Sequence, residues 1–125
     1  MLVVRDIAFD GKHTYKEFLE SEERIATNVL SDRLKRLEQN GILVKQQKPE
    51  DRRIMMYALT EKGIGLIPAL FALSNWSYQY DPDTDADPKV AAQFDRDPLG
   101  TVDAAQRSVR YDQTGLGLAV DSDTG

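Results

Sequence analysis

A helix that leads directly into a charged hairpin is the feature that most constrains how this chain folds. Leu30, Leu34 and Leu37 recur at positions i, i+4 and i+7, so residues 27–40 have one apolar face. Asn40-Gly41 ends this pattern, and glycine readily takes the left-handed conformation found after helix ends. The sequence therefore predicts an amphipathic helix over residues 27–40 that turns one face toward a core.

Two strand candidates follow the end of this helix. Residues 42–48 and 54–59 are the candidates, and residues 49–53 between them read Pro-Glu-Asp-Arg-Arg. Turn-forming and charged residues at that place predict a hairpin loop with arginines at its tip. A helix followed by such a hairpin predicts an α+β winged helix-turn-helix fold with a two-stranded wing.

Two shorter helices are predicted ahead of this unit. Residues 1–9 are mostly apolar, and a glycine soon breaks the segment. Thr14 can cap a helix over residues 15–20, since Glu17 stands at the third helical position, as in a capping box. The polar residues 21–24 then connect this helix to the amphipathic one.

A long C-terminal helix of the same domain is predicted over residues 61–80. Pro68 should bend this helix or mark the point where it restarts. Its apolar side chains cover more than one face, so we expect it to be buried against a partner, most simply as the dimerisation helix of a homodimer. The candidate dimer-interface residues are Leu66, Ile67, Leu70, Phe71, Leu73 and Trp76.

Charge is distributed unevenly along the chain. The net charge is −5, yet residues 24–53 hold eight basic and four acidic side chains. Residues 81–125 hold ten aspartates and four basic side chains. Local excess charge, and not the total, determines attraction to nucleic acid. The sequence therefore predicts a domain over residues 1–80 that can face nucleic acid, followed by an acidic extension.

The extension is predicted to be only partly ordered. Residues 81–88 alternate aspartate with small residues and proline, which is typical of a linker. Residues 89–96 and 99–110 have weak helical character, and residues 112–125 are expected to be disordered.

The residue inventory argues against several functional classes. The chain has no cysteine, so disulfides and thiolate metal ligands are excluded and the cytoplasm is the expected compartment. No apolar run approaches the roughly 18 residues of a membrane span. His13, the one histidine, has no ligand or catalytic partner at a suitable spacing, and we expect it at the surface or in a turn. These observations predict no enzyme, no cofactor and no membrane partner.

The aspartates at positions 81, 83, 85 and 87 deserve comparison with a calcium loop. Such a loop needs glycine at its sixth position and glutamate at its twelfth, and these positions hold Ala86 and Ala92. A solvated acidic linker is therefore the better interpretation, and no metal site is expected.

The polar face of the helix over residues 27–40 suits contact with base edges. Asparagine can pair with adenine, basic groups with guanine or phosphate, and serine with either. Periodicity alone favours a simple solvated surface, and the neighbouring wing with its basic side chains is what shifts the balance toward DNA. The candidate DNA-contacting residues are Thr27, Asn28, Ser31, Lys35 and Arg36 in the helix, and Lys45, Lys48, Arg52 and Arg53 in the wing.

Several of these segments together resemble the HxlR-type, MarR-like branch of winged-helix transcriptional regulators. Residues 25–42, IATNVLSDRLKRLEQNGI, are similar to the family's spaced leucines, its arginine and its closing glycine. Residues 57–63, YALTEKG, match the family's Tyr-x-Leu-Thr-x-x-Gly, and Trp76 stands where a late tryptophan is found. The resemblance covers about residues 1–80. It implies a homodimer that binds an inverted-repeat operator in double-stranded DNA, with the helix in the major groove and the wing on the backbone or minor groove.

The chain also departs from that family's pattern. Members normally have a further helix and a Gly-Lys-Trp-like segment before the position where this sequence begins, and many carry an N-terminal cysteine that this chain lacks. Any sensing is therefore expected to use an unidentified small-molecule effector or another subunit. The alternative function is a winged-helix module for protein interaction or ligand sensing without DNA binding of its own.

Overall fold

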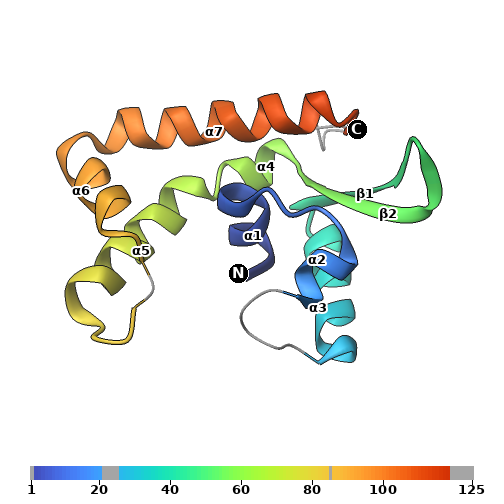
Figure 1. Cartoon of the computed structure of the whole chain (residues 1–125), viewed down its shortest axis with the longest axis horizontal. Coiled ribbons are helices and arrows are strands. Elements are labelled where there is room, and N and C mark those ends of the chain that lie inside the picture. Colours follow the sequence, from blue (N-terminus) through green and yellow to red (C-terminus); the bar gives the residue numbers. More distant parts are fainter. Residues whose placement is uncertain (1, 21–25, 85, 119–125) are drawn as a thin grey trace.

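The fold combines a body of helices with one two-stranded antiparallel sheet in the described part of the chain, which confirms the predicted α+β class. The computed structural model describes residues 2–20, 26–84 and 86–118. Its elements are α1 (Leu2–Asp10), α2 (Tyr15–Leu19), α3 (Thr27–Gln39), β1 (Leu43–Lys48), β2 (Asp51–Leu59), α4 (Glu61–Ile64), α5 (Ile67–Tyr80), α6 (Pro88–Arg96) and α7 (Pro98–Gly115). The hairpin projects from one end of the body, α2 and α3 lie on one side of it, and α7 crosses the opposite side (Figure 1).

The helix predicted over residues 27–40 is present as α3, with Leu30 and Leu34 buried. Gly41 has a φ of 73°, the left-handed conformation that the sequence predicts at this position. Gly41 N–H donates to the Glu38 carbonyl at 3.1 Å, and Ile42 N–H donates to the Leu37 carbonyl at 2.9 Å. These two bonds satisfy carbonyls that the end of a helix otherwise leaves without a donor.

The wing is the antiparallel pair of β1 and β2, and its tip differs from the prediction. Leu43 pairs with Leu59 and Gln47 with Met55, but the register then shifts so that Lys48 pairs with Asp51. The predicted loop over residues 49–53 is wrong, because β2 starts at Asp51 and the turn contains only residues 49–50. The register shift leaves residues 52–54 without a partner in β1. Such an irregularity bends a strand and changes the direction of its side chains.

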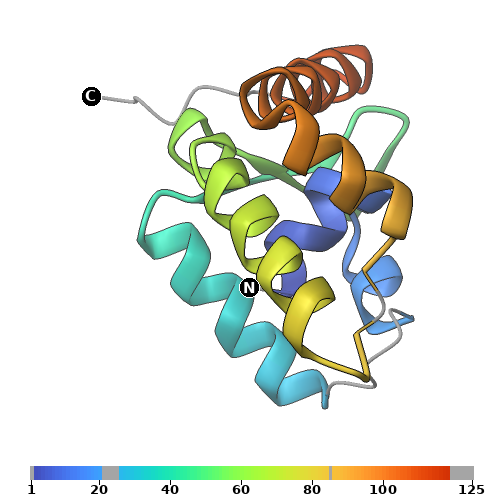
Figure 2. The ribbon, with the colours of Figure 1, turned by 90° about the vertical axis from the view of Figure 1, so that its left-hand side faces the viewer.

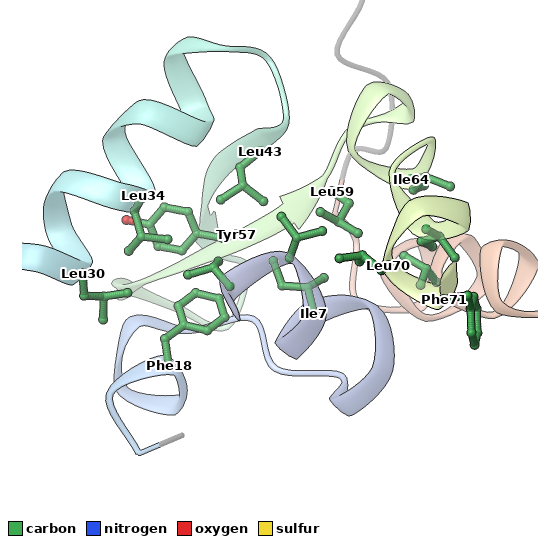
Figure 3. Close-up of a cluster of buried hydrophobic side chains, with 14 residues drawn as sticks. Ile7, Phe18, Leu30, Leu34, Leu43, Tyr57, Leu59, Ile64, Leu70 and Phe71 are labelled. Atoms are coloured by element: carbon green, nitrogen blue, oxygen red, sulfur yellow. The ribbon is translucent and has the colours of Figure 1, made fainter. Parts of the chain in front are cut away.

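A hydrophobic core joins the helix-turn-helix segment to the rest of the fold. Leu30 and Leu34 of α3 point toward Phe18 and Tyr57, whose ring centroids lie 6.0 Å apart (Figure 3). The same cluster continues through Leu59 of β2 into the α4–α5 region. Because each buried side chain of this size contributes about 1.5–3 kcal/mol, the orientation of α3 is fixed by packing.

The long helix predicted over residues 61–80 is interrupted and forms α4 and α5. α5 begins at Ile67 with Pro68 in its first turn. Backbone N–H groups in the first turn have no partner within the helix, so proline costs no hydrogen bond there. The predicted restart is confirmed. Just before the interruption, the backbone at Gly63 lies close to the backbone at Ile42. A Cβ atom there would lie 2.5 Å from the Ile42 carbonyl oxygen, so only glycine fits.

The C-terminal extension folds back onto the domain as α6 and α7. α6 contacts α5, and α7 contacts both α1 and α5, as the second view shows (Figure 2). The expected disorder from residue 112 onward is wrong for residues 112–118, because α7 continues to Gly115 and Leu118 is buried against Met56 and Ala58. Residues 119–125 lie outside the described residues. No helix within the described ranges is long and apolar enough to cross a membrane.

The acidic linker is held by local hydrogen bonds. Asp81 accepts from the Asp83 N–H at 2.9 Å, and Asp87 accepts from the Lys89 N–H at 2.9 Å, which caps α6. Asp85 lies outside the described part of the chain. Among the residues that are described, no cluster of three or more acidic or histidine side chains is arranged to hold a metal ion.

Candidate nucleic-acid interface

The first helix of the helix-turn-helix segment, α2, is fixed by the capping box that the sequence predicts. Glu17 N–H donates to Thr14 Oγ1 at 3.2 Å, while Glu17 Oε1 accepts from the Thr14 N–H at 3.1 Å and from the His13 N–H at 3.1 Å. Burial alone would raise the pKa of Glu17, but these hydrogen bonds hold that pKa below its ordinary value. The carboxylate therefore stays ionised and anchors the start of α2.

Tyr15 connects α2 to the first turns of α3. Its hydroxyl donates to the Thr27 carbonyl at 3.1 Å and lies 3.1 Å from Ser31 Oγ. The Ser31 hydroxyl that the sequence suggests for base contact thus already has a partner within the fold. Tyr15 is missing from the sequence-based candidates, since a tyrosine in a short helix shows no pattern that indicates this contact.

His13 lies in the loop before α2 and is buried. The predicted surface position is therefore wrong. His13 is 4% exposed, and its Nδ1 lies 2.9 Å from the Tyr57 carbonyl oxygen. Tyr57 N–H in turn donates to the His13 carbonyl at 2.7 Å. These contacts attach the segment before α2 to the outer edge of β2. They therefore fix the position of the helix-turn-helix segment relative to the wing.

The polar face of α3 is exposed along its length. Leu30 and Leu34 occupy the buried face, and all five candidate DNA-contacting residues of the helix are exposed on the other side. Arg36 forms an ion pair with Asp32 one turn earlier, with Nε and Oδ2 3.0 Å apart. Both partners are largely exposed, so this pair contributes little stability and the arginine remains able to exchange its partner.

The wing carries its basic side chains at and near the tip. Lys45 and Arg52 are exposed, and Lys48 is half-buried. The side chain of Arg53 is 89% exposed, and its Nε and Nη2 donate to the two carboxylate oxygens of Asp51, at 3.0 Å each. The hydrogen bonds from Arg53 lower the pKa of Asp51, and the same pair raises the pKa of Arg53. The wing therefore offers one arginine that is held by an aspartate and one that is not paired within the described residues.

The base of the wing is held by α7, a contact that the sequence-based candidates lack. Leu59 N–H donates to Gln113 Oε1 at 2.8 Å, and Gln113 Nε2 donates to the Leu59 carbonyl at 3.0 Å. Arg110 binds Glu61 through two nitrogens at 2.8 and 3.0 Å, which lowers the pKa of Glu61. Gln113 follows the buried Val109 by four residues, and this helical spacing is the signal that indicates its position.

The candidate dimer-interface residues divide into two groups in the structure. Ile67, Leu70 and Phe71 are buried inside the single chain, and Leu66 is half-buried. Leu73 and Trp76 are 62% and 59% exposed. Tyr80, which the sequence-based candidates omit, is 67% exposed, and its ring centroid lies 5.6 Å from that of Trp76. We call the exposed surface formed by the aromatic Trp76 and Tyr80, together with Leu73, the α5 aromatic face.

Two sequence-based observations fall on residues 21–25, which lie outside the described residues. These are the polar connector between α2 and α3 and the first residue of the IATNVLSDRLKRLEQNGI segment. Arg24, which contributes to the basic balance of residues 24–53, belongs to the same stretch. The interface described above therefore rests on α2, α3 and the wing alone.

The sequence profile of the HxlR-like helix-turn-helix family matches residues 1–85. The chain belongs to this family. This match confirms the resemblance found in the sequence, and it includes α2, α3 and the wing but neither α6 nor α7. The winged helix-turn-helix interpretation of the fold is thereby confirmed as well.

Named relatives agree with this assignment. The chain is 36% identical over 74 residues to the HTH-type transcriptional regulator YodB of Bacillus subtilis (strain 168), an alignment that covers 59% of this chain and 66% of YodB. It is 35% identical over 71 residues to an uncharacterized HTH-type transcriptional regulator of Methanothermobacter thermautotrophicus, covering 57% of this chain and 54% of that protein. The chain thus spans between half and two thirds of these relatives, which are regulators and not enzymes.

A solved structure gives the same result. The crystal structure of PA1607, a protein proposed to be a transcription factor, superposes with a TM-score of 0.59 at 37% sequence identity. The superposition covers 70% of this chain and 59% of PA1607. At this identity and score, the two proteins share the fold over the superposed part of the chain.

Proposed function

We propose that this protein is a sequence-specific DNA-binding transcriptional regulator that acts as a homodimer in the cytoplasm. The observation that carries the proposal is the exposed polar face of α3, held at a fixed angle by buried leucines, beside a wing with basic side chains at its tip. Membership of a helix-turn-helix family supports this use of α3.

In this proposal α3 enters the major groove. Thr27, Asn28, Ser31 and Lys35 contact base edges or the adjacent backbone, because they share the exposed face of the helix. Tyr15 acts as a positioning residue, since it binds the backbone of Thr27 and the hydroxyl of Ser31. Arg36 remains bound to its own helix until a phosphate replaces its aspartate partner.

The wing binds phosphates or the minor groove beside the helix. Lys45, Lys48, Arg52 and Arg53 supply the positive charge for these contacts. Arg52 is available at once, whereas Arg53 must first exchange Asp51 for a phosphate. The wing is therefore expected to contribute affinity that depends on salt, and little sequence preference.

The homodimer is proposed to form through the α5 aromatic face. Burial of Ile67, Leu70 and Phe71 within one chain supports a narrower interface than the sequence suggests, centred on Leu73, Trp76 and Tyr80. A two-fold dimer presents two copies of α3, and its operator is then an inverted repeat with half-sites about one helical turn (~10 base pairs) or a multiple of it apart.

A second function deserves the same test. The α5 aromatic face could instead bind another regulator, in which case the chain is a protein-interaction module without DNA binding of its own. The exposure of Trp76 and Tyr80 is the observation that favours this alternative. An unidentified small-molecule effector is compatible with both functions.

Selection from a pool of randomised DNA duplexes tests the proposal. The full chain should enrich an inverted repeat, and Asn28→Ala should change which bases are enriched while leaving α3 folded. Arg107→Ala, an exposed change on α7 outside this interface, serves as the matched control. A pool that stays random after selection with the unaltered chain contradicts sequence-specific binding.

Sedimentation of the full chain tests the dimer separately. The unaltered chain should sediment as a dimer at micromolar concentration, and Trp76→Asp should convert it to a monomer because a buried charge without a partner is strongly unfavourable. Tyr111→Asp, at an exposed tyrosine of α7, is the control and should leave the dimer unchanged. A folded monomer for the unaltered chain rules out the symmetric operator.

A further inference from the structure

A cavity of about 840 Å³ lies between α1, α5, α6 and α7. Its walls come from two parts of the chain: α1 and α5 belong to the family-matched residues 1–85, whereas Val90, Ala105 and Ser108 belong to the extension. The extension therefore supplies one wall of this open cavity. Its volume falls within the range of pockets that hold small organic molecules.

One side of the cavity is apolar and aromatic. Phe9 and Phe71 line it, and their ring centroids lie 5.0 Å apart. Behind them, Phe94 stacks on Phe71 with a centroid distance of 5.5 Å and an interplanar angle of 8°. Val90 of α6 adds an aliphatic contact. Rigid aromatic side chains arranged in this way favour a flat apolar group as the occupant.

The charged groups around the cavity differ in whether they already have partners. Arg5 and Lys12 are both half-buried, and neither forms an ion pair with any residue in the described ranges. Asp87 is occupied by the α6 cap, and Asp6 is engaged within the fold. Asp10 is the remaining acidic group, and it is exposed. Arg5 and Lys12 are therefore the cationic groups open to a ligand, and the exposed carboxylates of Asp10 and Asp87 lie beside them in the lining.

We propose that this cavity binds a small molecule with a flat apolar body and a single carboxylate or sulfonate group. The anionic group binds Arg5 and Lys12. Its charge-assisted hydrogen bond to the arginine is the strongest contact available to it. The apolar body lies against Phe9, Phe71 and Val90. This proposal rests on the proposed function. It gives the small-molecule effector of that function a binding site and a ligand class.

The site is placed where a ligand can affect the helix-turn-helix segment. Lys12 lies in the short loop between α1 and α2, and its N–H donates to the Asp6 carbonyl at 3.1 Å. The next residue, His13, is bound to β2 through Tyr57. A ligand that holds Lys12 therefore acts on the segment that sets the position of α2 against the wing.

Binding of two fluorescent probes to the full chain tests the site without DNA. 8-Anilinonaphthalene-1-sulfonate carries the flat apolar body and the anionic group, and N-phenyl-1-naphthylamine carries the same ring system without charge. The sulfonate should bind the unaltered chain at least tenfold more tightly than the neutral probe. Equal affinity for the two probes overturns the proposed role of the positive charges.

Variants separate this cavity from other apolar surfaces. Arg5→Gln with Lys12→Gln should weaken sulfonate binding about tenfold and leave binding of the neutral probe unchanged. Lys16→Gln with Arg96→Gln removes the same charge at exposed positions and should have no effect. Ser108→Trp, which places a large side chain at the α7 wall of the cavity, should weaken binding of both probes.

Two outcomes overturn the proposal. If Trp76→Ser abolishes the sulfonate signal while the Arg5 and Lys12 variant retains it, the probe binds the α5 aromatic face. If Ser108→Trp remains folded by circular dichroism and binds both probes with unchanged affinity, the cavity is not the site. Because no DNA is present, these results are independent of whether the chain binds an operator.

Discussion

Replacing Gln113 by leucine tests how the extension supports the wing. The Gln113 side chain is 0% exposed and makes two hydrogen bonds with Leu59, itself 0% exposed. Leucine has a similar volume, so the change removes the amide without opening a large cavity. It leaves one buried N–H and one buried carbonyl without a partner. Each such group costs about 1–3 kcal/mol, so Gln113→Leu should lower the free energy of unfolding by about 2–6 kcal/mol.

Two control variants provide smaller losses of stability for comparison. Gln106→Leu removes a single hydrogen bond, from Gln106 Nε2 to the Ile64 carbonyl at 3.1 Å, and should cost about 1 kcal/mol. Arg107→Ala removes an exposed ion pair with Asp103 and should cost between 0 and about 1 kcal/mol. The order of destabilisation is therefore Gln113, then Gln106, then Arg107.

Urea unfolding followed by far-ultraviolet circular dichroism measures all three variants. Protein concentration must be the same throughout, because the proposed dimer would add to the measured stability. If Gln113→Leu is within about 0.5 kcal/mol of the unaltered chain, the reasoning is refuted, since changes of that size are typical of surface positions. In that case the contacts of α7 do not hold the wing.

Three further predictions concern the interface. Asp51→Asn should strengthen binding to random-sequence DNA, because it releases Arg53 for phosphate; fluorescence anisotropy that shows weaker binding contradicts this. Tyr15→Phe removes the hydroxyl bound to Ser31 and should lower the free energy of unfolding by about 0.5–1.5 kcal/mol, measured by urea unfolding. The pKa of Glu17 is lower in the folded chain, so its stabilising effect is present above the ordinary value of 4.5 and is lost as pH falls through the folded pKa. Acid titration of Glu17→Gln should therefore show a smaller loss of stability than the unaltered chain, and equal losses contradict the assignment.

Features that depend on neighbouring residues are those that the sequence predicts well. The apolar face of α3, the left-handed Gly41 and the Thr14–Glu17 capping box each involve side chains within a few residues of one another. Their geometry follows from helix periodicity and local hydrogen bonds. The restart at Pro68 follows in the same way from the missing N–H of proline.

Features that depend on distant segments escape local patterns. The apolar residues of α5 look alike in sequence, but α1 and the extension cover Leu70 and Phe71 and leave Trp76 exposed. His13 is buried against β2, where the Tyr57 carbonyl is its hydrogen-bond partner. The division of a hydrophobic helix into core and surface is therefore set by tertiary packing, which periodicity does not contain.

The salt dependence of DNA binding is the measurement that tests the central claim most directly. Anisotropy titrations of the full chain with a selected duplex, repeated over a range of salt concentrations, give the slope of log K against log salt. Arg52→Ala with Arg53→Ala should weaken binding to every duplex and reduce the magnitude of that slope by about 1–2, because each lost phosphate contact accounts for about 0.9. An unchanged affinity and an unchanged slope would show that the wing does not contact DNA.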